Sequence, residues 1–373
     1  MKVLNNFVLG NYVSEEYFCD RVSETNRVIN SIENGRNINL ISHRRYGKTG
    51  LIFHILHKIS KKNSYKTVYI DLLNTKNFND FVKEFATVVL NELESKTAKI
   101  LKSFAKIVKG IQPSFSINPY SGATEVNFEM RKNYSSELSI RELFQYLELL
   151  NMRLVIAFDE FQQILNYPED NVEATLRKYI QQSHNLSFIY SGSQKHLLTS
   201  MFSDYNRPFY QSAEFLFLDK IERNTYADFI KDNFEKAKQK IETEAVDLIL
   251  ELSKRHTYYT QFLCNRIFSM RMKKIDCGVV VKVFDEILYE NRAVYYTYEK
   301  MLTKRQFGLL KAISKEVNLT QPTSREFIQK HNLPTPSSVR AALTAILEKE
   351  VAYEEGGAYF VYDVFFSRYL ERL

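Results

Sequence analysis

The chain has 373 residues, 45% of them hydrophobic and 25% charged, which is ample for a buried core and suggests roughly two or three domains. The few glycines (11) and prolines (7) exclude a low-complexity or collagen-like chain. The formal net charge of +7 fits weak attraction to a polyanion, but 44 acidic residues offset the 51 basic ones, so an ordinary basic surface explains it as well.

The cysteines and the first residues indicate the cellular compartment in which the protein is expected. Cys19, Cys264 and Cys277 lie far apart and form no Cys-x-x-Cys pair, which is typical of a reducing environment. The opening KVLNNFVLGNY lacks the apolar core of a signal peptide, and no stretch approaches about 18 uninterrupted apolar residues. We therefore expect a cytoplasmic protein without a membrane span.

Short apolar runs alternate with amphipathic stretches over roughly the first 220 residues. Buried strands are expected at 38–42, 67–73, 154–158, 186–192 and 214–218. Near-continuous apolar strands separated by helical patterns indicate a parallel sheet covered on both faces. We expect residues 1–220 to form this α/β core, with an insertion at about 96–132 that ends in a hairpin around Asn118 to Gly122.

Two further patterns follow the core. Residues 221–300 have helical periodicity throughout, which predicts a helical domain. From 301 to 373, short helices at 304–315 and 324–330 precede a longer one that begins near Pro336, and two strands follow about Gly356 and Gly357. This order of three helices and a hairpin is typical of a winged helix-turn-helix domain.

A phosphate-binding motif connects the first strand to a helix. The sequence SHRRYGKTG matches the pattern Gly-x-x-x-x-Gly-Lys-[Ser/Thr] except that Ser42 replaces the first glycine. Backbone N–H groups of such a loop and the helix dipole bind phosphate oxygens. Because serine is small, we expect the loop to be competent. The residues expected to line the nucleotide are Ser42, His43, Arg44, Arg45, Tyr46, Gly47, Lys48, Thr49 and Gly50.

Each polar group of the motif has an expected role. Lys48 would contact the β- and γ-phosphates, the Thr49 hydroxyl would coordinate Mg²⁺, and Gly47 would let the backbone approach the phosphates. A second motif, RLVIAFDEF, places Asp159 and Glu160 at the end of a buried strand, where adjacent carboxylates are costly without a function. We expect Asp159 to support the Mg²⁺ ion and Glu160 to polarise the attacking water. Together the motifs predict ATP or ADP binding with Mg²⁺ and hydrolysis of ATP.

Other candidate residues have two interpretations each. Ser191 and Ser193 end the following strand and can sense the γ-phosphate or hold water, or they belong to a serine-rich turn. Arg207 can act as an arginine finger, in trans if the protein assembles, or is an exposed loop arginine. His54 and His57 share a helix, but because no third ligand is evident we do not expect a metal there.

The motifs together resemble those of archaeal-type ATPases in the STAND branch of the AAA+ superclass, over nearly the whole chain. SHRRYGKTGL resembles that group's Gly-Pro-Arg-Arg-x-Gly-Lys-Thr-Ser-Leu, with Ser42 and Gly50 departing from it. In the leading segment, Phe18, Arg21 and Glu24 match a phrase Phe-x-x-Arg-x-x-Glu that borders the adenine in the group. The resemblance therefore implies that Phe18 and Arg21 contact the nucleotide.

A later segment carries the same resemblance. KRHTYYTQFLC resembles the group's lid phrase Gly-His-Pro-Tyr-Tyr-x-Gln, in which the histidine lies near the phosphates. His256 matches it, whereas Arg255 and Thr257 depart from the pattern. The resemblance implies an α/β P-loop NTPase core with strand order 5-1-4-3-2, a helical lid and a C-terminal winged helix.

Two function classes are compatible with the sequence. The first is a nucleotide-controlled switch with slow Mg²⁺-dependent ATPase activity that works through a protein partner or self-assembly. The second is a DNA-binding regulator whose nucleotide is largely structural. The expected recognition helix carries only Arg340 and Lys349, beside Glu348 and Glu350, so docking of the winged helix on the lid or core competes with DNA binding.

Overall fold

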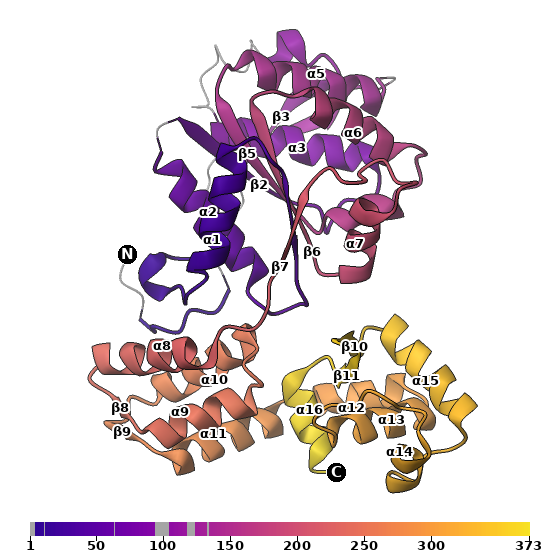
Figure 1. Ribbon diagram of the computed structural model, residues 1–373. Helices are drawn as coiled ribbons and strands as arrows, with labels where there is room; N and C mark the ends of the chain where they lie inside the picture. Colours follow the sequence, from indigo (N-terminus) through magenta and orange to yellow (C-terminus); the bar gives the residue numbers. More distant parts are fainter. Residues whose placement is uncertain (1–3, 11, 63, 94–103, 118–123, 133) are drawn as a thin grey trace. The chain divides into compact units, whose positions relative to one another are not determined.

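The computed structural model describes residues 4–10, 12–62, 64–93, 104–117, 124–132 and 134–373 (Figure 1). They belong to two compact units, Gly10–Asp219 and Met1–Leu9 with Lys220–Leu373. Phe7 explains why the first residues belong with the C-terminal unit: it is fully buried, and its ring centroid lies 4.8 Å from that of Phe234.

The Gly10–Asp219 unit is built on a five-stranded sheet of order β2-β5-β6-β1-β7, in which all the pairs are parallel. Its strands are β1 (Ile38–Ile41), β2 (Tyr65–Asp71), β5 (Arg153–Asp159), β6 (Leu186–Gly192) and β7 (Glu214–Phe217). Numbered one to five along the chain, they follow the order 5-1-4-3-2. The expected strands, the parallel sheet and its order are confirmed.

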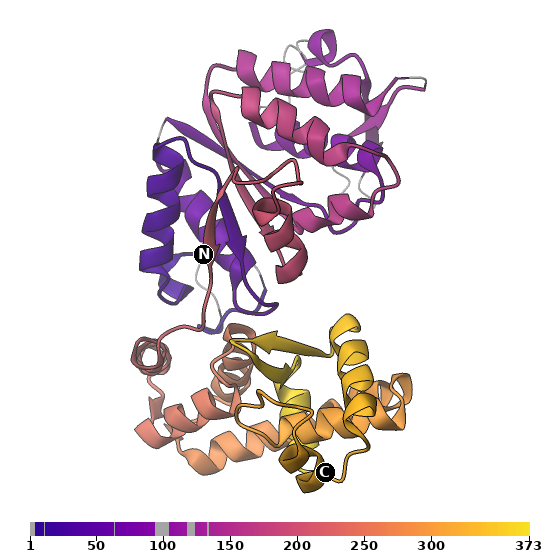
Figure 2. The same ribbon diagram turned by 45° about the vertical axis from the view of Figure 1, so that its right-hand side comes forward.

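Helices cover both faces of this sheet (Figures 1 and 2). On one face lie α1 (Val22–Glu33) and α2 (Lys48–Ser60); on the other lie α3 (Phe78–Leu93), α5 (Ser136–Leu149), α6 (Val172–Gln182) and α7 (Lys195–Ser203). Side chains of a strand alternate between the two cores: Val155 and Ala157 pack with α1 and α2, whereas Ile156 and Phe158 pack with the opposite helices. Burial on both faces is why these strands are almost continuously apolar.

The expected insertion contains a separate antiparallel hairpin, β3 (Ile111–Ile117) paired with β4 (Thr124–Met130). The hairpin is confirmed, although its turn from Asn118 to Gly122 and residues 96–103 of the insertion lie outside the described residues. The fully buried Phe104 and Phe128 attach the insertion to the core beside α3 and α5, with ring centroids 5.8 Å apart.

In the second unit, a helical segment comes first. It consists of α8 (Arg223–Lys236), α9 (Thr243–Leu252), α10 (Thr257–Ser269) and α11 (Cys277–Glu290), with two-residue strands β8 (Lys240–Ile241) and β9 (Lys274–Ile275). These four helices are named the lid helices below. Among the described residues, no helix combines the length and apolar character needed to cross a membrane.

The winged helix domain follows α12 (Arg292–Met301). It contains α13 (Lys304–Ser314), α14 (Arg325–Lys330), α15 (Pro336–Glu348), β10 (Ala352–Glu355), β11 (Ala358–Val361) and α16 (Val364–Glu371). A capping box between Thr303 and Gln306 starts α13, and Pro336 occupies the first turn of α15 as its sequence predicts. The expected three helices and hairpin are confirmed.

The winged helix packs on the lid helices through α16. The ring of Phe365 is buried against Tyr259 of α10 and Phe284 of α11, with centroids 4.8 Å and 5.6 Å away. Arg368 donates hydrogen bonds to the carbonyl oxygens of Glu251, at 2.6 Å, and Leu252, at 3.3 Å. The winged helix thus docks on the lid helices through α16, whereas binding of DNA by this domain stays a prediction.

Candidate functional site

Three neighbouring strands bring the predicted residues together. In the register of β1 and β6, Ile41 lies beside Gly192, so the loop that starts at Ser42 is next to Ser193. On the other side of β6, β5 ends at Asp159. Because the carboxyl ends of parallel strands meet at one edge, loop, carboxylates and serines converge there.

The loop from Ser42 to Gly47 contains two residues with a left-handed backbone conformation. Arg45 (φ 69°) and Gly47 (φ 87°) are left-handed, a conformation that glycine adopts readily and that arginine adopts at a cost. Alternation of left-handed residues with others turns successive N–H groups toward one concave side, and Lys48 then begins α2. Buried Ser42 donates a hydrogen bond to the His43 carbonyl oxygen at 3.0 Å, so the serine is accommodated within the loop.

Asp159 lies at the centre of the site and accepts several hydrogen bonds. The hydroxyls of Thr49 (2.9 Å) and Tyr69 (3.0 Å) donate to its Oδ2, and that of Ser191 (2.6 Å) to its Oδ1. The Lys48 Nζ lies 3.6 Å from Oδ1. Burial opposes ionisation of Asp159, but the adjacent ammonium and these hydrogen bonds hold its pKa below the ordinary value. The group is therefore an anion at neutral pH.

Glu160 is held by a different set of donors. Its Oε2 accepts hydrogen bonds from the Ser193 backbone N–H (3.1 Å), the Ser193 hydroxyl (2.9 Å) and Gln162 Nε2 (2.5 Å). Its other oxygen, Oε1, lies 3.8 Å from Lys48 Nζ. Glu160 also has a left-handed backbone (φ 52°), a conformation that costs free energy and is found disproportionately at functional sites.

The loop is connected to the end of β6 through Arg44. Its Nε donates a hydrogen bond to the Ser193 hydroxyl oxygen at 3.2 Å. A chain of contacts thus runs from Arg44 through Ser193 to Glu160. Ser191 and Ser193, for which the sequence left two interpretations, both contact a carboxylate of the site.

The leading segment packs against the middle of α2. The Phe18 ring stacks on His54, with centroids 4.3 Å apart and planes at 14°, and the Tyr12 hydroxyl lies 3.1 Å from His54 Nδ1. Buried Arg21 donates to the carbonyl oxygen of Asp219 at 2.6 Å and forms an ion pair with Glu24 at 2.7 Å. These contacts position the segment, and direct contact of Phe18 or Arg21 with a nucleotide stays a prediction.

Two predicted residues have other observed partners. Arg207 forms an ion pair with Glu173 of α6 at 2.8 Å. His256 belongs to the second unit, where it is buried at the start of α10, 3.4 Å from the Tyr353 hydroxyl. Their roles as finger and phosphate sensor stay predictions.

Three residues of the site were not predicted from the sequence. Tyr69 and Gln162 contact the two carboxylates. Gly192 leaves room for Gln162, because a Cβ at position 192 would lie 2.0 Å from the Gln162 Oε1 atom. The signal for Gly192 was present, since it is a glycine at the end of a buried strand. The contact of Tyr69 depends on which strands are neighbours, whereas Gln162 contacts Glu160 from only two residues further along the chain.

The donor set fits a nucleotide and a magnesium ion. The Thr49 hydroxyl oxygen and Asp159 Oδ2, both hard oxygen ligands, already lie 2.9 Å apart. Lys48 is buried beside them and begins the helix whose first N–H groups face the loop. The arrangement offers the groups that bind a polyphosphate, and the action of Glu160 on a water molecule stays a prediction.

Comparison with known proteins supports the α/β core and the winged helix described above. A family described as "probable winged helix domain" matches residues 293–372. A Walker-type ATPase of Pyrococcus abyssi has a similar structure, with 19% identity, coverage of 99% of this chain and 100% of that chain, and a TM-score of 0.67. No curated protein sequence matches the chain.

Two other solved structures share the architecture at lower similarity. The ORC2 protein of Aeropyrum pernix has 12% identity, coverage of 98% of this chain and 96% of that chain, and a TM-score of 0.60. Cdc6p of Pyrobaculum aerophilum has 12% identity, coverage of 98% and 97%, and a TM-score of 0.50. The chain therefore has the fold of these archaeal ATPase-like proteins, an α/β core with a parallel sheet followed by a C-terminal winged helix.

Proposed function

We propose that the protein binds ATP and ADP with Mg²⁺ and hydrolyses ATP slowly, as a nucleotide-controlled switch. The observation that carries this proposal is the cluster of Lys48, Thr49, Asp159 and Glu160 at the carboxyl edge of the sheet. The fold comparison supports it, since a solved structure of the A. pernix ORC2 protein is described as ADPNP–ADP complexes. We also propose membership of the STAND branch, which rests on the sequence motifs alone.

In this proposal, the residues of the site have the roles that phosphoryl transfer to water requires, apart from an arginine finger. Loop N–H groups and Lys48 would bind the phosphates, and Thr49 and Asp159 would hold Mg²⁺, which neutralises charge that develops on the γ-phosphoryl group. Glu160 accepts its hydrogen bonds through Oε2, and its other oxygen, Oε1, lies 3.8 Å from Lys48 Nζ. We expect Oε1 to orient and polarise the water.

Slow turnover is expected because the described part of the site has no arginine finger in place, as the candidate Arg207 is paired with another residue. Beyond Lys48 and Mg²⁺, an arginine finger contributes roughly 10³ to 10⁵ in rate, and the candidate Arg207 is paired with Glu173. A partner or a second copy of the chain would then have to bring a cation into place. A switch of this kind changes state with the bound nucleotide rather than by rapid cycling.

Calorimetry with ADP and Mg²⁺ tests the proposal. Lys48→Ala should weaken binding at least tenfold, equivalent to about 1.4 kcal/mol, while Ser42→Gly, the matched loop control, should change affinity little. Glu160→Gln should retain ATP binding and lose turnover, because it removes the water-polarising carboxylate only. Equal ADP affinity in the wild type and Lys48→Ala would refute the proposed site.

The second function class, a DNA-binding regulator with a structural nucleotide, predicts different behaviour. Its ATPase-deficient Glu160→Gln variant would keep full biological and DNA-binding activity. Turnover stimulated by a protein partner in the absence of DNA favours the switch.

A further inference from the structure

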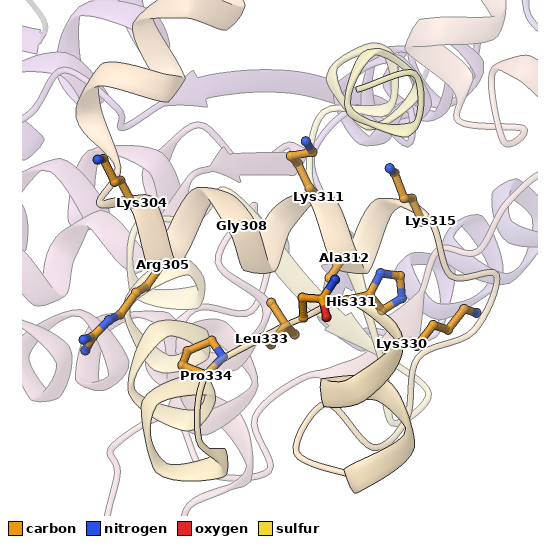
Figure 3. A pocket seen from close by; sticks show the side chains of 11 residues that line it. Lys304, Arg305, Gly308, Lys311, Ala312, Lys315, Lys330, His331, Leu333 and Pro334 are labelled. Atoms are coloured by element: carbon orange, nitrogen blue, oxygen red, sulfur yellow. The ribbon is translucent and has the colours of Figure 1, made fainter.

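A cleft in the winged helix domain is lined by cationic side chains. It has a volume of about 630 Å³ and lies between α13 and the turn that joins α14 to α15 (Figure 3). The cations that line it are Lys304, Arg305, Lys311, Lys315 and Lys330, and we name this feature the basic cleft. In the part of the chain that the structure describes, no carboxylate is among the residues that line it.

The charges are spread along a line rather than around a point. Lys304, Lys311 and Lys315 follow one side of α13 (Figure 3), at a spacing that keeps residues on one helix face. Eleven residues of α-helix span about 16 Å. A single phosphate would need converging donors, whereas this row suits an extended polyanion with regularly spaced charges.

Several of these cations are available to a ligand. Lys304, Arg305 and Lys315 are exposed, and among the described residues they form no ion pair. Lys330 is paired with Glu316 at 2.6 Å, and Lys311 donates to the main-chain oxygen of Leu373 at 3.3 Å. Glu316 therefore neutralises only one end of the basic cleft.

Gly308 is a second, independent sign that something approaches α13 closely. It occupies the interior of the helix, where glycine costs roughly 0.5–1 kcal/mol relative to alanine. Packing does not explain it, since a Cβ built at this position meets nothing within 4 Å. The glycine keeps the wall of the basic cleft shallow between Lys304 and Lys311, so that a ligand backbone can reach the helix.

The usual recognition surface of a winged helix has the opposite character here. On α15 the exposed cation is Arg340, accompanied by the exposed Glu348. Lys349, the residue that caps the end of α15, is also exposed, but it donates hydrogen bonds to the Met301 carbonyl oxygen and to Gln306 Oε1, both at 3.4 Å. The wing strands carry Glu354 and Glu355. This surface is less suited to a polyanion than the basic cleft, which five cationic side chains line.

We propose that the basic cleft binds the phosphate backbone of duplex DNA without reading its base sequence. A helix-turn-helix scaffold presents rigid helices to a duplex, and backbone contacts from lysine and arginine supply affinity but no sequence information. The duplex offers a rigid row of phosphates that a row of cations along α13 can follow. This inference concerns a site separate from the nucleotide site and goes beyond the proposed function.

Fluorescence anisotropy of the full chain with a labelled duplex, without nucleotide, tests this. Affinity should fall with salt, with a log–log slope of about −0.9 for each phosphate neutralised. Lys304→Gln with Lys315→Gln should weaken binding at least tenfold at low salt and reduce the slope by about 2. Arg340→Gln, the matched control on α15, should change affinity by less than twofold.

A second variant tests access to α13 without changing charge. Gly308→Gln places a neutral side chain in open space and improves helix propensity, so it should weaken DNA binding at least fivefold with an unchanged or higher Tm. Loss of binding in Arg340→Gln alone, or unchanged binding in the double lysine variant, would overturn the proposal. Equally tight binding of single-stranded DNA, RNA or polyglutamate would also overturn it, because the ligand would then not be duplex DNA.

Discussion

Ser193 donates two hydrogen bonds to one oxygen of Glu160, from its backbone N–H at 3.1 Å and from its hydroxyl at 2.9 Å. The same hydroxyl oxygen accepts from Arg44 of the phosphate-binding loop. A residue of the loop is thus connected to the expected water-polarising carboxylate through one serine side chain. Ser193 orients Glu160 and need not contact nucleotide itself to matter for hydrolysis.

Ser193→Ala should lower the ATPase rate roughly tenfold while ADP affinity changes little. Only the hydroxyl is removed, so the backbone N–H still holds Glu160 and part of the general-base contribution of about 10² to 10⁴ survives. Steady-state turnover and ADP calorimetry on the same preparation measure the two effects. A parallel loss of ADP affinity would instead assign Ser193 to nucleotide binding.

Arg207→Ala should lower stability as well as the stimulated ATPase rate. Burial raises the pKa of Glu173 and the nearby Arg207 lowers it, so removing the arginine leaves a half-buried carboxylate without its cation. We expect a lower Tm for this variant. Its loss of activity alone would therefore not identify an arginine finger.

Two further variants separate the effect on stability from the effect on the stimulated rate. They are the single Glu173→Gln and the double Arg207→Ala with Glu173→Gln. The neutral amide introduced by Glu173→Gln should release the arginine with little loss of Tm, and the assembled or partner-stimulated rate should stay equal or rise. If Arg207 is the finger, the double variant loses the stimulated rate, by roughly 10³ or more. A double variant as active as Glu173→Gln would rule the finger out.

The stability of the protein should decrease as the pH falls from about 6.5 to about 4, in part through His54. Burial, followed by the nearby Lys58, lowers the pKa of His54 to about 4, whereas a histidine in the unfolded chain titrates near 6.5. Below pH 6.5 the unfolded state binds a proton that the folded state does not, so the contribution is complete above pH 6.5 and is lost toward pH 4. Denaturant unfolding across this range measures the slope.

His54→Asn should flatten that slope, even though it also removes the stack on Phe18 and lowers the overall stability. His57→Asn, an exposed position on the same helix, is the control and should keep the wild-type slope. The low pKa of Asp159 contributes mainly below about pH 4, outside this window. Identical slopes for His54→Asn and the wild type would contradict the assignment.

Phe365→Ala should destabilise the lid helices, by about 3 kcal/mol, because it removes a buried ring from between α10 and α11. Deletion of the residues after Leu302 should have a larger effect and expose apolar surface. Thermal unfolding and binding of a hydrophobic dye report both changes. A truncated chain with the wild-type Tm and no increase in dye binding would contradict the observed docking.

The sequence predicted the architecture well because its signals are local. Apolar runs such as 186–192 are buried on both faces, and the motifs at Lys48 and Asp159 follow strands that end at the same edge. The division at 220 and 300 stays a proposal. The contacts of Phe365 join lid helices and winged helix in one compact unit, which periodicity along the chain does not reveal.

Contacts between elements that are distant along the chain could not be predicted from the sequence. Tyr69 reaches Asp159 because β2 pairs with β5, an arrangement that no spacing along the chain encodes. The basic cleft differs, since Lys304, Lys311 and Lys315 have helical spacing that the sequence displays. Its charges were not predicted to bind DNA because a winged helix usually contacts bases through its later helix, which here begins at Pro336.

Through Arg368 the winged helix caps the end of α9, a role that a winged helix fold does not itself require. The last carbonyl groups of a helix have no partner within that helix, and here α16 satisfies those of Glu251 and Leu252 at the end of α9. The winged helix is therefore not an interchangeable module. A chimaera that replaced it with a foreign winged helix would have to keep the α16 surface, or α9 would lose the side chain that completes its end.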